Sequence, residues 1–129
     1  MADMPSITVP LRPRYCECDP MGYVHHSVYP VWMELARTEL LRQSGKSYAQ
    51  WEREGLLIVV VRLNLSFHQP ARYDDELAIT ATLTRAAGAK IEHDYQVSRD
   101  GERLVTGSTV LACVSRDGRP VRVPADLQP

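Results

Sequence analysis

One change in the spacing of apolar residues restricts the fold of this chain more than any other feature, and it falls at Gly55. Before it, apolar side chains recur every three to four residues across 28–42, which is the period of a helix. After it, apolar and polar residues alternate in four segments, which is the period of a half-buried β-strand. The four segments are 61–68, 77–84, 91–98 and 104–114. We therefore expect one long helix followed by four strands.

The connections between these strands are short and rich in turn-forming residues. The turn signals stand at 74–75, 87–88 and 100–101. Short connections join neighbouring antiparallel strands, so the strands should form a meander. A further strand is predicted at Ile7–Tyr15, where two prolines are typical of a sheet edge. Together these segments predict the α+β class, with an antiparallel sheet of about five strands wrapped around one long central helix.

Residues at both ends of the long helix fit known end signals. Ser27 can cap its first turn, and Pro30 falls within that turn, where the missing N–H of proline does no harm. Arg42 lies in the last turn and Gly45 follows as a helix-ending glycine. A second, shorter helix is expected at 47–54.

The polar face of the predicted sheet has two open interpretations. It would either face solvent or form a polar interface between subunits, and the sequence favours neither. The residues on this face are Arg62, Asn64, Thr80, Thr82, Glu92 and Gln96.

Length, charge and cysteine content narrow the class of protein. A chain of 129 residues has the size of one domain, so a single domain is expected over 1–129. The net charge of −1 argues against nucleic acid as a partner. No apolar run has the length of a membrane span and no signal peptide is evident, so we expect no membrane partner and a cytoplasmic location. Three cysteines make a poor disulfide framework and are expected to be reduced.

The segment Tyr15–Glu34, YCECDPMGYVHHSVYPVWME, concentrates reactive side chains ahead of the helix. The first interpretation is a metal site, because two cysteines and two histidines offer four zinc ligands. They are Cys16, Cys18, His25 and His26, and the single residue between the cysteines departs from known zinc spacings. A cysteine nucleophile with a histidine base is the second interpretation, although no glycine-rich elbow surrounds either cysteine. Neither is favoured, and no metal is expected.

The third interpretation is a carboxylate site. Asp19 lies in a turn-rich stretch, and the helix begins eight residues later. Free N–H groups at a helix N-terminus carry partial positive charge and can hold a developing oxyanion. A carboxylate held near such a terminus can attack a carbonyl carbon or activate water against it.

The order of residues in this region also resembles a known family. The positions that carry the resemblance are Asp19, Gly22, Val24, His26, Tyr29, Glu34 and 36–39, together with 67–77 and the tail 120–124. They resemble the hot-dog-fold acyl-CoA thioesterases, and more closely the 4-hydroxybenzoyl-CoA thioesterase family with its YbgC-like branch. The similarity extends over nearly the whole chain, from Ile7 to Leu127.

The resemblance implies a function and a set of site residues. Water would cleave the thioester of an acyl- or aroyl-coenzyme A to free acid and coenzyme A, so coenzyme A is part of the substrate and no cofactor is needed. Asp19 would be the catalytic carboxylate, as nucleophile or general base, and the backbone N–H of His26 would be the oxyanion donor. The implied substrate-binding residues are Gly22, Val24, His25 and Tyr29, with Arg85 and Lys90 as the nearest candidates for the coenzyme A phosphates. The family forms homodimers with the active site between subunits, often paired into tetramers.

Two features leave alternatives open. Glu34 and Glu39 lie on the helix, where a second branch of this fold places its catalytic acid. The intact Asp19 motif favours a structural role for both, with Glu34 paired to Arg37. Basic residues near Arg85 are few, so an acyl group on a carrier protein, or acyl-CoA binding without catalysis, is an alternative function.

Overall fold

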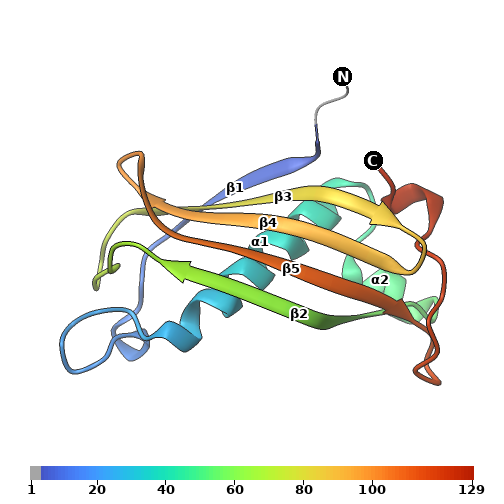
Figure 1. Ribbon diagram of the computed structural model, residues 1–129, viewed down its shortest axis with the longest axis horizontal. Coiled ribbons are helices and arrows are strands. Elements are labelled where there is room, and N and C mark those ends of the chain that lie inside the picture. Colours follow the sequence, from blue (N-terminus) through green and yellow to red (C-terminus); the bar gives the residue numbers. More distant parts are fainter. Residues whose placement is uncertain (1–3) are drawn as a thin grey trace.

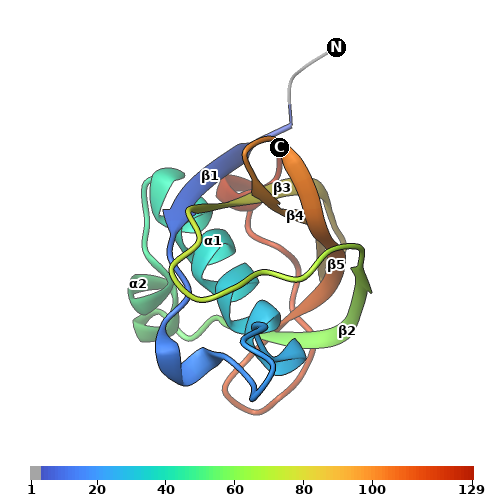
Figure 2. The same ribbon diagram turned by 90° about the vertical axis from the view of Figure 1, so that its left-hand side faces the viewer.

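The computed structural model describes residues 4–129, and its elements follow the predicted order of strand, helix and four strands. A five-stranded antiparallel sheet curves around the helix α1, as Figures 1 and 2 show. The strands are β1 (Ser6–Leu11), β2 (Leu57–Phe67), β3 (Leu77–Ala87), β4 (Lys90–Arg99) and β5 (Glu102–Val114). The α-helices are α1 (Tyr29–Gln43) and α2 (Tyr48–Arg53), and single 3-10 turns form η1 (Tyr15–Glu17), η2 (His26–Val28) and η3 (Ala125–Leu127). The predicted fold class is therefore confirmed.

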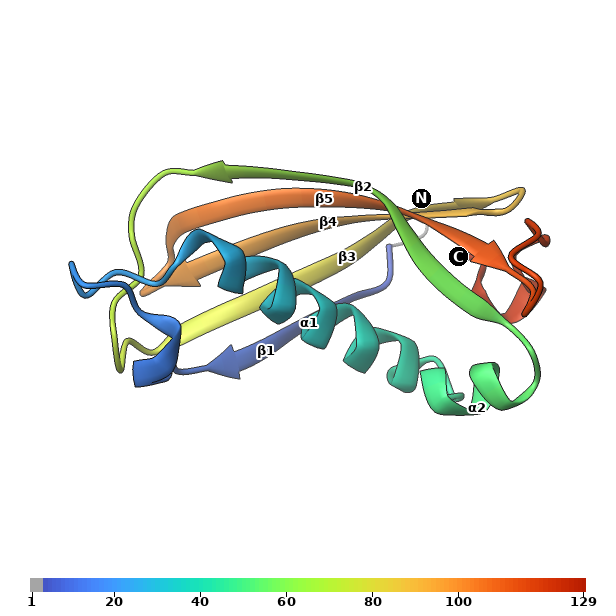
Figure 3. The ribbon, with the colours of Figure 1, turned by 90° about the horizontal axis from the view of Figure 1, so that it is seen from below.

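The sheet order is β1-β3-β4-β5-β2, so β1 and β2 are its two edges. The β3–β4 and β4–β5 hairpins turn at the predicted positions, 87–88 and 100–101. Gly88 and Gly101 both adopt positive φ there. The helix α1 lies along the concave face of the sheet, seen from below in Figure 3. None of the helices within residues 4–129 is long and apolar enough to cross a membrane.

The core consists of two groups of buried side chains, one at each end of α1. The loop-side cluster lies next to the segment before the helix and contains Val24, Tyr29, Trp32, Met33, Ala36, Ala71, Leu77, Ile79, Ala81, Tyr95, Val97, Leu104 and Val105. The tail-side cluster lies between α2, the sheet and the C-terminal residues and contains Trp51, Leu56, Ala86, Ile91, Leu111, Cys113, Val123 and Leu127.

Gly107 on β5 is required by close packing. A Cβ there would lie 2.8 Å from the backbone oxygen of Asn64 and 3.0 Å from Cε of Met33. The first distance is too short for any side chain, because the backbone oxygen cannot move aside cheaply. The bare backbone of Gly107 lets β2 and α1 approach β5 closely.

Three predicted details of the elements are wrong. The first strand ends at Leu11 rather than Tyr15, and η1 follows instead of more strand. Ser27 does not cap the helix, because a 3-10 turn precedes α1 and the side chain of His25 accepts from the Ser27 amide. The strand expected at 61–68 extends from Leu57 to Phe67 and is exposed along most of its length rather than half-buried.

The two edge strands of the sheet differ, because β2 exposes a long row of apolar side chains. Its apolar side chains Val59, Val60, Val61, Leu63 and Phe67 are between 42% and 55% exposed. Edge strands are normally short or carry residues that prevent pairing, as β1 does with Pro10. The long apolar edge of β2 therefore fits burial against a further chain.

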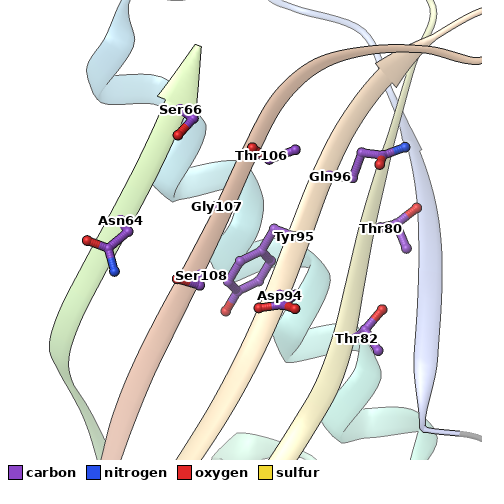
Figure 4. Close-up of a pocket in the computed structure, with 10 residues that line it drawn as sticks. All are labelled: Asn64, Ser66, Thr80, Thr82, Asp94, Tyr95, Gln96, Thr106, Gly107 and Ser108. Atoms are coloured by element: carbon purple, nitrogen blue, oxygen red, sulfur yellow. The ribbon is translucent and has the colours of Figure 1, made fainter. Parts of the chain in front are cut away.

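The face of the sheet turned away from α1 is polar, as predicted, and slightly hollowed (Figure 4). The hollow has a volume of about 540 Å³. Its polar side chains are Asn64, Ser66, Thr80, Thr82, Asp94, Gln96, Thr106 and Ser108. Hydroxyl pairs tie β1 to β3 beside it, with Thr8 and Thr80 at 2.9 Å.

Candidate active site

The segment before α1 folds back on itself as a short hairpin. The amide of His25 donates to the carbonyl of Glu17 at 2.9 Å, Cys18 pairs with Val24, and the amide of Asp19 donates to the carbonyl of Tyr23 at 2.7 Å. Asp19 therefore lies beside the tip of this hairpin, and the first turn of the helical segment begins where the hairpin ends. The two residues of the proposed reaction, Asp19 and His26, belong to one small backbone unit.

The carboxylate of Asp19 is fixed by backbone amides. Its Oδ1 accepts from the amide of Met21 at 2.9 Å and from the amide of Tyr23 at 3.2 Å. The amide of Gly22 closes the turn on the Asp19 carbonyl at 2.9 Å. Gly22 has φ of 81° and open space around it, so the turn needs glycine for its backbone angle. The half-buried carboxylate is thus held in one orientation through its Oδ1.

The amide of His26 is the free donor at the start of the helical segment. The amide of Ser27 donates to Nδ1 of His25 at 3.2 Å, and the amide of Val28 donates to the His25 carbonyl at 3.0 Å. Within residues 4–129 the His26 amide has no such partner. The His25 and His26 rings lie 4.2 Å apart and both residues are exposed. A free amide backed by a helix dipole is suited to an oxyanion.

The side chains of Val24, on the hairpin itself, and of Tyr29, at the start of α1, are buried in the core rather than exposed at the surface. Tyr29 is 2% exposed, and its hydroxyl accepts from the Ala71 amide at 3.4 Å. The Val24 amide donates to the Ala71 carbonyl at 2.9 Å, and Val24 is 6% exposed. Burial raises the pKa of the Tyr29 phenol, which keeps it neutral. Both residues form the floor that holds the hairpin.

Glu17 is the site residue that sequence reasoning missed. It is 8% exposed and accepts from Nε1 of Trp32 at 3.1 Å and from the Arg14 amide at 2.7 Å. Burial raises the pKa of this carboxyl, but the Arg14 amide, the Arg14 guanidinium and the Trp32 indole outweigh it, so the pKa is lowered. Glu17 fastens the base of the hairpin to α1. The signal was the three-residue spacing of Arg14 and Glu17, which closes a capping box on η1.

A second anchor holds the loop that supports the hairpin. The guanidinium of Arg99 donates to Asp75 at 2.8 Å and to the Pro70 carbonyl at 3.4 Å. The Arg72 amide donates to the same Asp75 carboxylate at 2.8 Å. These bonds fix the position of Ala71, which carries both contacts to the hairpin floor.

Arg85 and Lys90 do not join this group within one chain. They lie at the β3–β4 turn, at the opposite end of the molecule from the hairpin (Figure 3). There they border a hollow of about 510 Å³ together with Arg62, a residue of the predicted polar face that was not predicted to bind phosphate. Arg85 pairs loosely with Glu92 at 3.9 Å, so the group keeps a net positive charge.

The cysteines and helix carboxylates are not arranged for catalysis. Cys16 is exposed, Cys18 is half-buried and Cys113 is buried in the tail-side cluster, all as free thiols. Burial raises the pKa of the Cys18 thiol, and the carboxylate of Asp19 adds to the rise, so a reactive thiolate is disfavoured. Within residues 4–129, no group of three or more His, Cys, Asp or Glu side chains is placed to hold a metal ion. Glu34 pairs with Arg37 at 3.4 Å, as predicted.

Comparison with known proteins places the chain in one family. The sequence model of the Thioesterase superfamily matches residues 21–106. The chain is 32% identical over 111 residues to the putative acyl-CoA thioesterase YneP of Bacillus subtilis, covering 84% of this chain and 80% of that protein. It is 31% identical over 106 residues to the acyl-CoA thioester hydrolase YbgC of Escherichia coli, covering 81% and 79% of the two chains.

Solved structures agree with the sequence matches. A crystal structure of a hypothetical protein from Thermus thermophilus superposes with a TM-score of 0.87 at 35% identity, covering 92% of both chains. A mutant of 4-hydroxybenzoyl-CoA thioesterase, complexed with 4-hydroxybenzoyl-CoA, superposes with a TM-score of 0.86 at 25% identity, covering 95% of both chains.

Proposed function

The chain belongs to the Thioesterase superfamily and is a hydrolase, and from this we propose that it cleaves the thioester of an acyl- or aroyl-coenzyme A. The observation that carries the proposal is the joint placement of Asp19 and His26 on one hairpin. A carboxylate fixed by two amides lies on the same short hairpin that leads into a helix start whose first amide is free.

In the proposed reaction, the thioester carbonyl oxygen accepts a hydrogen bond from the His26 amide. That amide and the helix dipole stabilise the negative charge that develops when the carbonyl carbon is attacked. Asp19 either attacks this carbon directly or takes a proton from the water that does. When Asp19 acts as the base, water adds to the carbon, the carbon–sulfur bond breaks and the proton taken by Asp19 passes to the leaving sulfur, so coenzyme A leaves as its thiol. When Asp19 attacks, the carbon–sulfur bond breaks to leave an acyl–Asp19 anhydride, the leaving thiolate takes a proton from water, and the resulting hydroxide hydrolyses the anhydride to the free acid and restores Asp19. The products are the free acid and coenzyme A, with no cofactor or metal in the cycle.

The basic group at the β3–β4 turn is proposed to bind the phosphates of coenzyme A. Arg62, Arg85 and Lys90 supply three cations around one hollow, and phosphates favour such clusters. We expect Arg85→Ala combined with Lys90→Ala to raise KM about three- to tenfold with kcat nearly unchanged, since these contacts exist equally in ground and transition states. Initial rates over a range of substrate concentrations measure both constants. An unchanged KM would remove the group from the binding site.

We further propose a homodimer joined along β2 and a tetramer formed through the polar face of the sheet. The exposed apolar side chains of β2 and the unpaired edge support the first contact, and the hollowed face in Figure 4 supports the second. Light scattering of the purified protein measures the mass directly. The three cysteines are free, as is ordinary in a reducing compartment, and we propose the cytoplasm as the place of action.

The proposed function is tested by Asp19→Asn, which keeps the size of the side chain and its backbone bonds. We expect thiol release from a panel of acyl- and aroyl-coenzyme A esters to fall about 10²- to 10⁴-fold, because a general base or nucleophile is lost. Asp117→Asn is the matched control, since Asp117 is exposed in the turn after β5. A fully active Asp19→Asn enzyme would remove Asp19 from the chemistry.

The outcomes also separate the alternative functions. Tight binding of coenzyme A esters without thiol release by the wild type would indicate a binding module. If the wild type neither binds nor cleaves free coenzyme A esters, acyl groups on a carrier protein become the substrate to test.

A further inference from the structure

His25 joins the hairpin of Asp19 to the helical segment that follows it. Its amide donates to the Glu17 carbonyl on the hairpin at 2.9 Å, and its carbonyl accepts from the Val28 amide at 3.0 Å. Its backbone angles, φ of −65° and ψ of 141°, are those of the residue that precedes a helix. The contacts that hold His25 therefore also set the direction of the turn that follows.

The peptide unit between His25 and His26 carries the proposed oxyanion donor. In a planar trans peptide, the C=O and the N–H point to opposite sides. The His25 carbonyl points into the helical turn, because it accepts from the Val28 amide. The His26 N–H therefore points out of the turn, and its direction depends on keeping that turn closed.

The side chain of His25 closes this turn as an N-cap. Its Nδ1 accepts from the Ser27 amide at 3.2 Å, one of the amides that a helix start leaves without a backbone partner. The common N-cap residues are Ser, Thr, Asp and Asn, so an imidazole is an unusual choice. A ring nitrogen accepts only when it carries no proton, so His25 can cap the turn only as the neutral imidazole.

Protonation of His25 would remove the cap. Both nitrogens of an imidazolium carry N–H groups. The Ser27 hydroxyl, 2.7 Å from Nδ1, can accept as well as donate, so that contact would survive. The Ser27 amide can only donate and would lose its acceptor. A positive charge at the positive end of the helix dipole is also unfavourable. Histidine is the side chain that ordinarily changes charge between about pH 5 and pH 8, so a histidine cap makes this turn sensitive to acid.

The surroundings of His25 leave its ring open to protons from solvent. His25 is exposed, and the His26 ring is stacked beside it at 4.2 Å. Within residues 4–129, neither ring takes part in an ion pair. The two carboxylates of the hairpin, Glu17 and Asp19, accept hydrogen bonds from other groups.

We propose that His25 is a positioning residue whose neutral imidazole holds the His26 amide in the direction that the oxyanion requires, so that acid slows the reaction through the loss of this cap. The proposal rests on the proposed function and adds a regulation by pH to the same site. His25 touches no reacting atom and acts through the turn. The family resemblance implies a different role, in substrate binding. Contact with bound substrate would change KM, whereas an oxyanion donor acts mainly in the transition state and changes kcat.

The first test compares His25→Ala, which has no cap, with His25→Asn, which offers the carbonyl oxygen of a common cap. Both constants are measured at about pH 8, where an imidazole is ordinarily neutral. For His25→Ala we expect kcat to fall about three- to tenfold with KM within about twofold of the wild type, because a lost cap shifts a helix start by a factor of about 2 to 30. His25→Asn should restore kcat to within about twofold of the wild type.

Two results of this test would overturn the proposal. A raised KM with unchanged kcat in His25→Ala would assign His25 to substrate binding. A value of kcat in His25→Asn as low as in His25→Ala would show that the imidazole supplies something other than a cap.

The second test follows kcat of the wild type and of His25→Asn from about pH 8 to about pH 5.5. We expect the ratio of wild type to variant to fall about three- to tenfold towards acid, because the histidine cap is lost there and the asparagine cap is not. Asp19 and the His26 ring are present in both proteins, so their protonation cancels in the ratio. His68→Asn is the matched control, because His68 is an exposed imidazole that bonds to Thr106 outside the hairpin.

The outcomes separate this proposal from the proposed function. A ratio that stays constant with pH would overturn the role of His25 while thioesterase activity stands. A ratio that rises in acid would overturn it too, since the charge of the imidazolium would then assist the oxyanion directly. If the wild type cleaves no ester at any pH, the proposed function fails and this proposal fails with it. Thermal melting identifies a variant that does not fold, and His25→Asn, which keeps a cap, carries the test if His25→Ala is lost.

Discussion

The two ends of α1 are built differently. At the hairpin end, buried polar atoms are paired: Nε1 of Trp32 donates to Glu17, and the Tyr29 hydroxyl accepts from the Ala71 amide at 3.4 Å. At the other end are the two atoms that lack partners among the buried side chains of residues 4–129. They are Nε1 of Trp51 and Nδ1 of His93. The cavity of about 350 Å³ between the C-terminal half of α1 and the sheet also lies at this second end.

The difference matches what the hairpin end is proposed to do. A reacting carboxylate must be held in one orientation, because small displacements of a catalytic group cost rate. The loop-side cluster and the bonds of Glu17 provide that rigidity. Open volume and unpaired buried polar atoms, which the tail-side end has, both lower the stability of the folded protein. We therefore expect substitutions at the loop-side end to cost more stability than similar substitutions at the tail-side end.

The largest effect is expected for Met33→Ala in the loop-side cluster. Met33 is fully buried in the loop-side cluster and lies against the bare backbone of Gly107. We expect the free energy of unfolding to fall by about 2–5 kcal/mol, the usual cost of such a cavity. Leu41→Ala is the comparison at the other end, where the side chain is half-buried beside an existing cavity. Denaturant unfolding should show a clearly smaller loss, and equal losses would contradict the comparison.

A smaller effect is expected for Glu17→Gln. Its carboxylate accepts bonds from Trp32 and Arg14, and bonds to a buried charged group contribute about 1.5–3 kcal/mol each. Gln keeps the shape but not the charge, so we expect a loss of about 1–3 kcal/mol at pH 7. Glu39→Gln is the control, since Glu39 pairs with Arg42 near the surface at 3.3 Å and should change stability little.

The effect of Glu17→Gln should depend on pH with a definite sign. The folded protein lowers the pKa of Glu17 below its ordinary value of 4.5. The ionised form therefore contributes stability above pH 4.5, and this contribution is lost as the pH falls through the lowered pKa. Unfolding measured from pH 7 to pH 3 should show the wild type and the variant converging in acid. A constant difference across this range would show that the charge of Glu17 is not what stabilises the hairpin.

The sheet and the long helix could be predicted from sequence because their signals are local. Alternating residues and glycine turns determine neighbouring strands, and the motif around Asp19 lies within one short segment. The local spacing of Arg14 and Glu17 could have indicated Glu17, but its bond to Trp32, fifteen residues away, depends on tertiary packing that no local pattern reports. The strand at Leu57–Phe67 was assigned to the core because apolar alternation indicates burial without saying which chain provides it. The cavity between α1 and the sheet depends on packing between distant elements, so no local pattern of residues predicts it.

The smallest effect compares the two tryptophans, which have the same side chain in opposite settings. Nε1 of Trp32 bonds to Glu17 at 3.1 Å, whereas Nε1 of Trp51 is buried without a partner within residues 4–129. Replacement by phenylalanine removes this N–H and part of the ring in both cases, so the two variants lose a similar apolar area. The difference between their losses of stability therefore reports the contribution of the N–H. We expect Trp32→Phe to cost about 1–2 kcal/mol more than Trp51→Phe, because it breaks a bond to a charged group while Trp51→Phe relieves an unpaired donor. Lys46 lies 4.0 Å from the centre of the Trp51 ring and keeps an aromatic partner in the variant. Equal losses in denaturant unfolding would mean that the indole N–H groups do not distinguish the two ends of the helix.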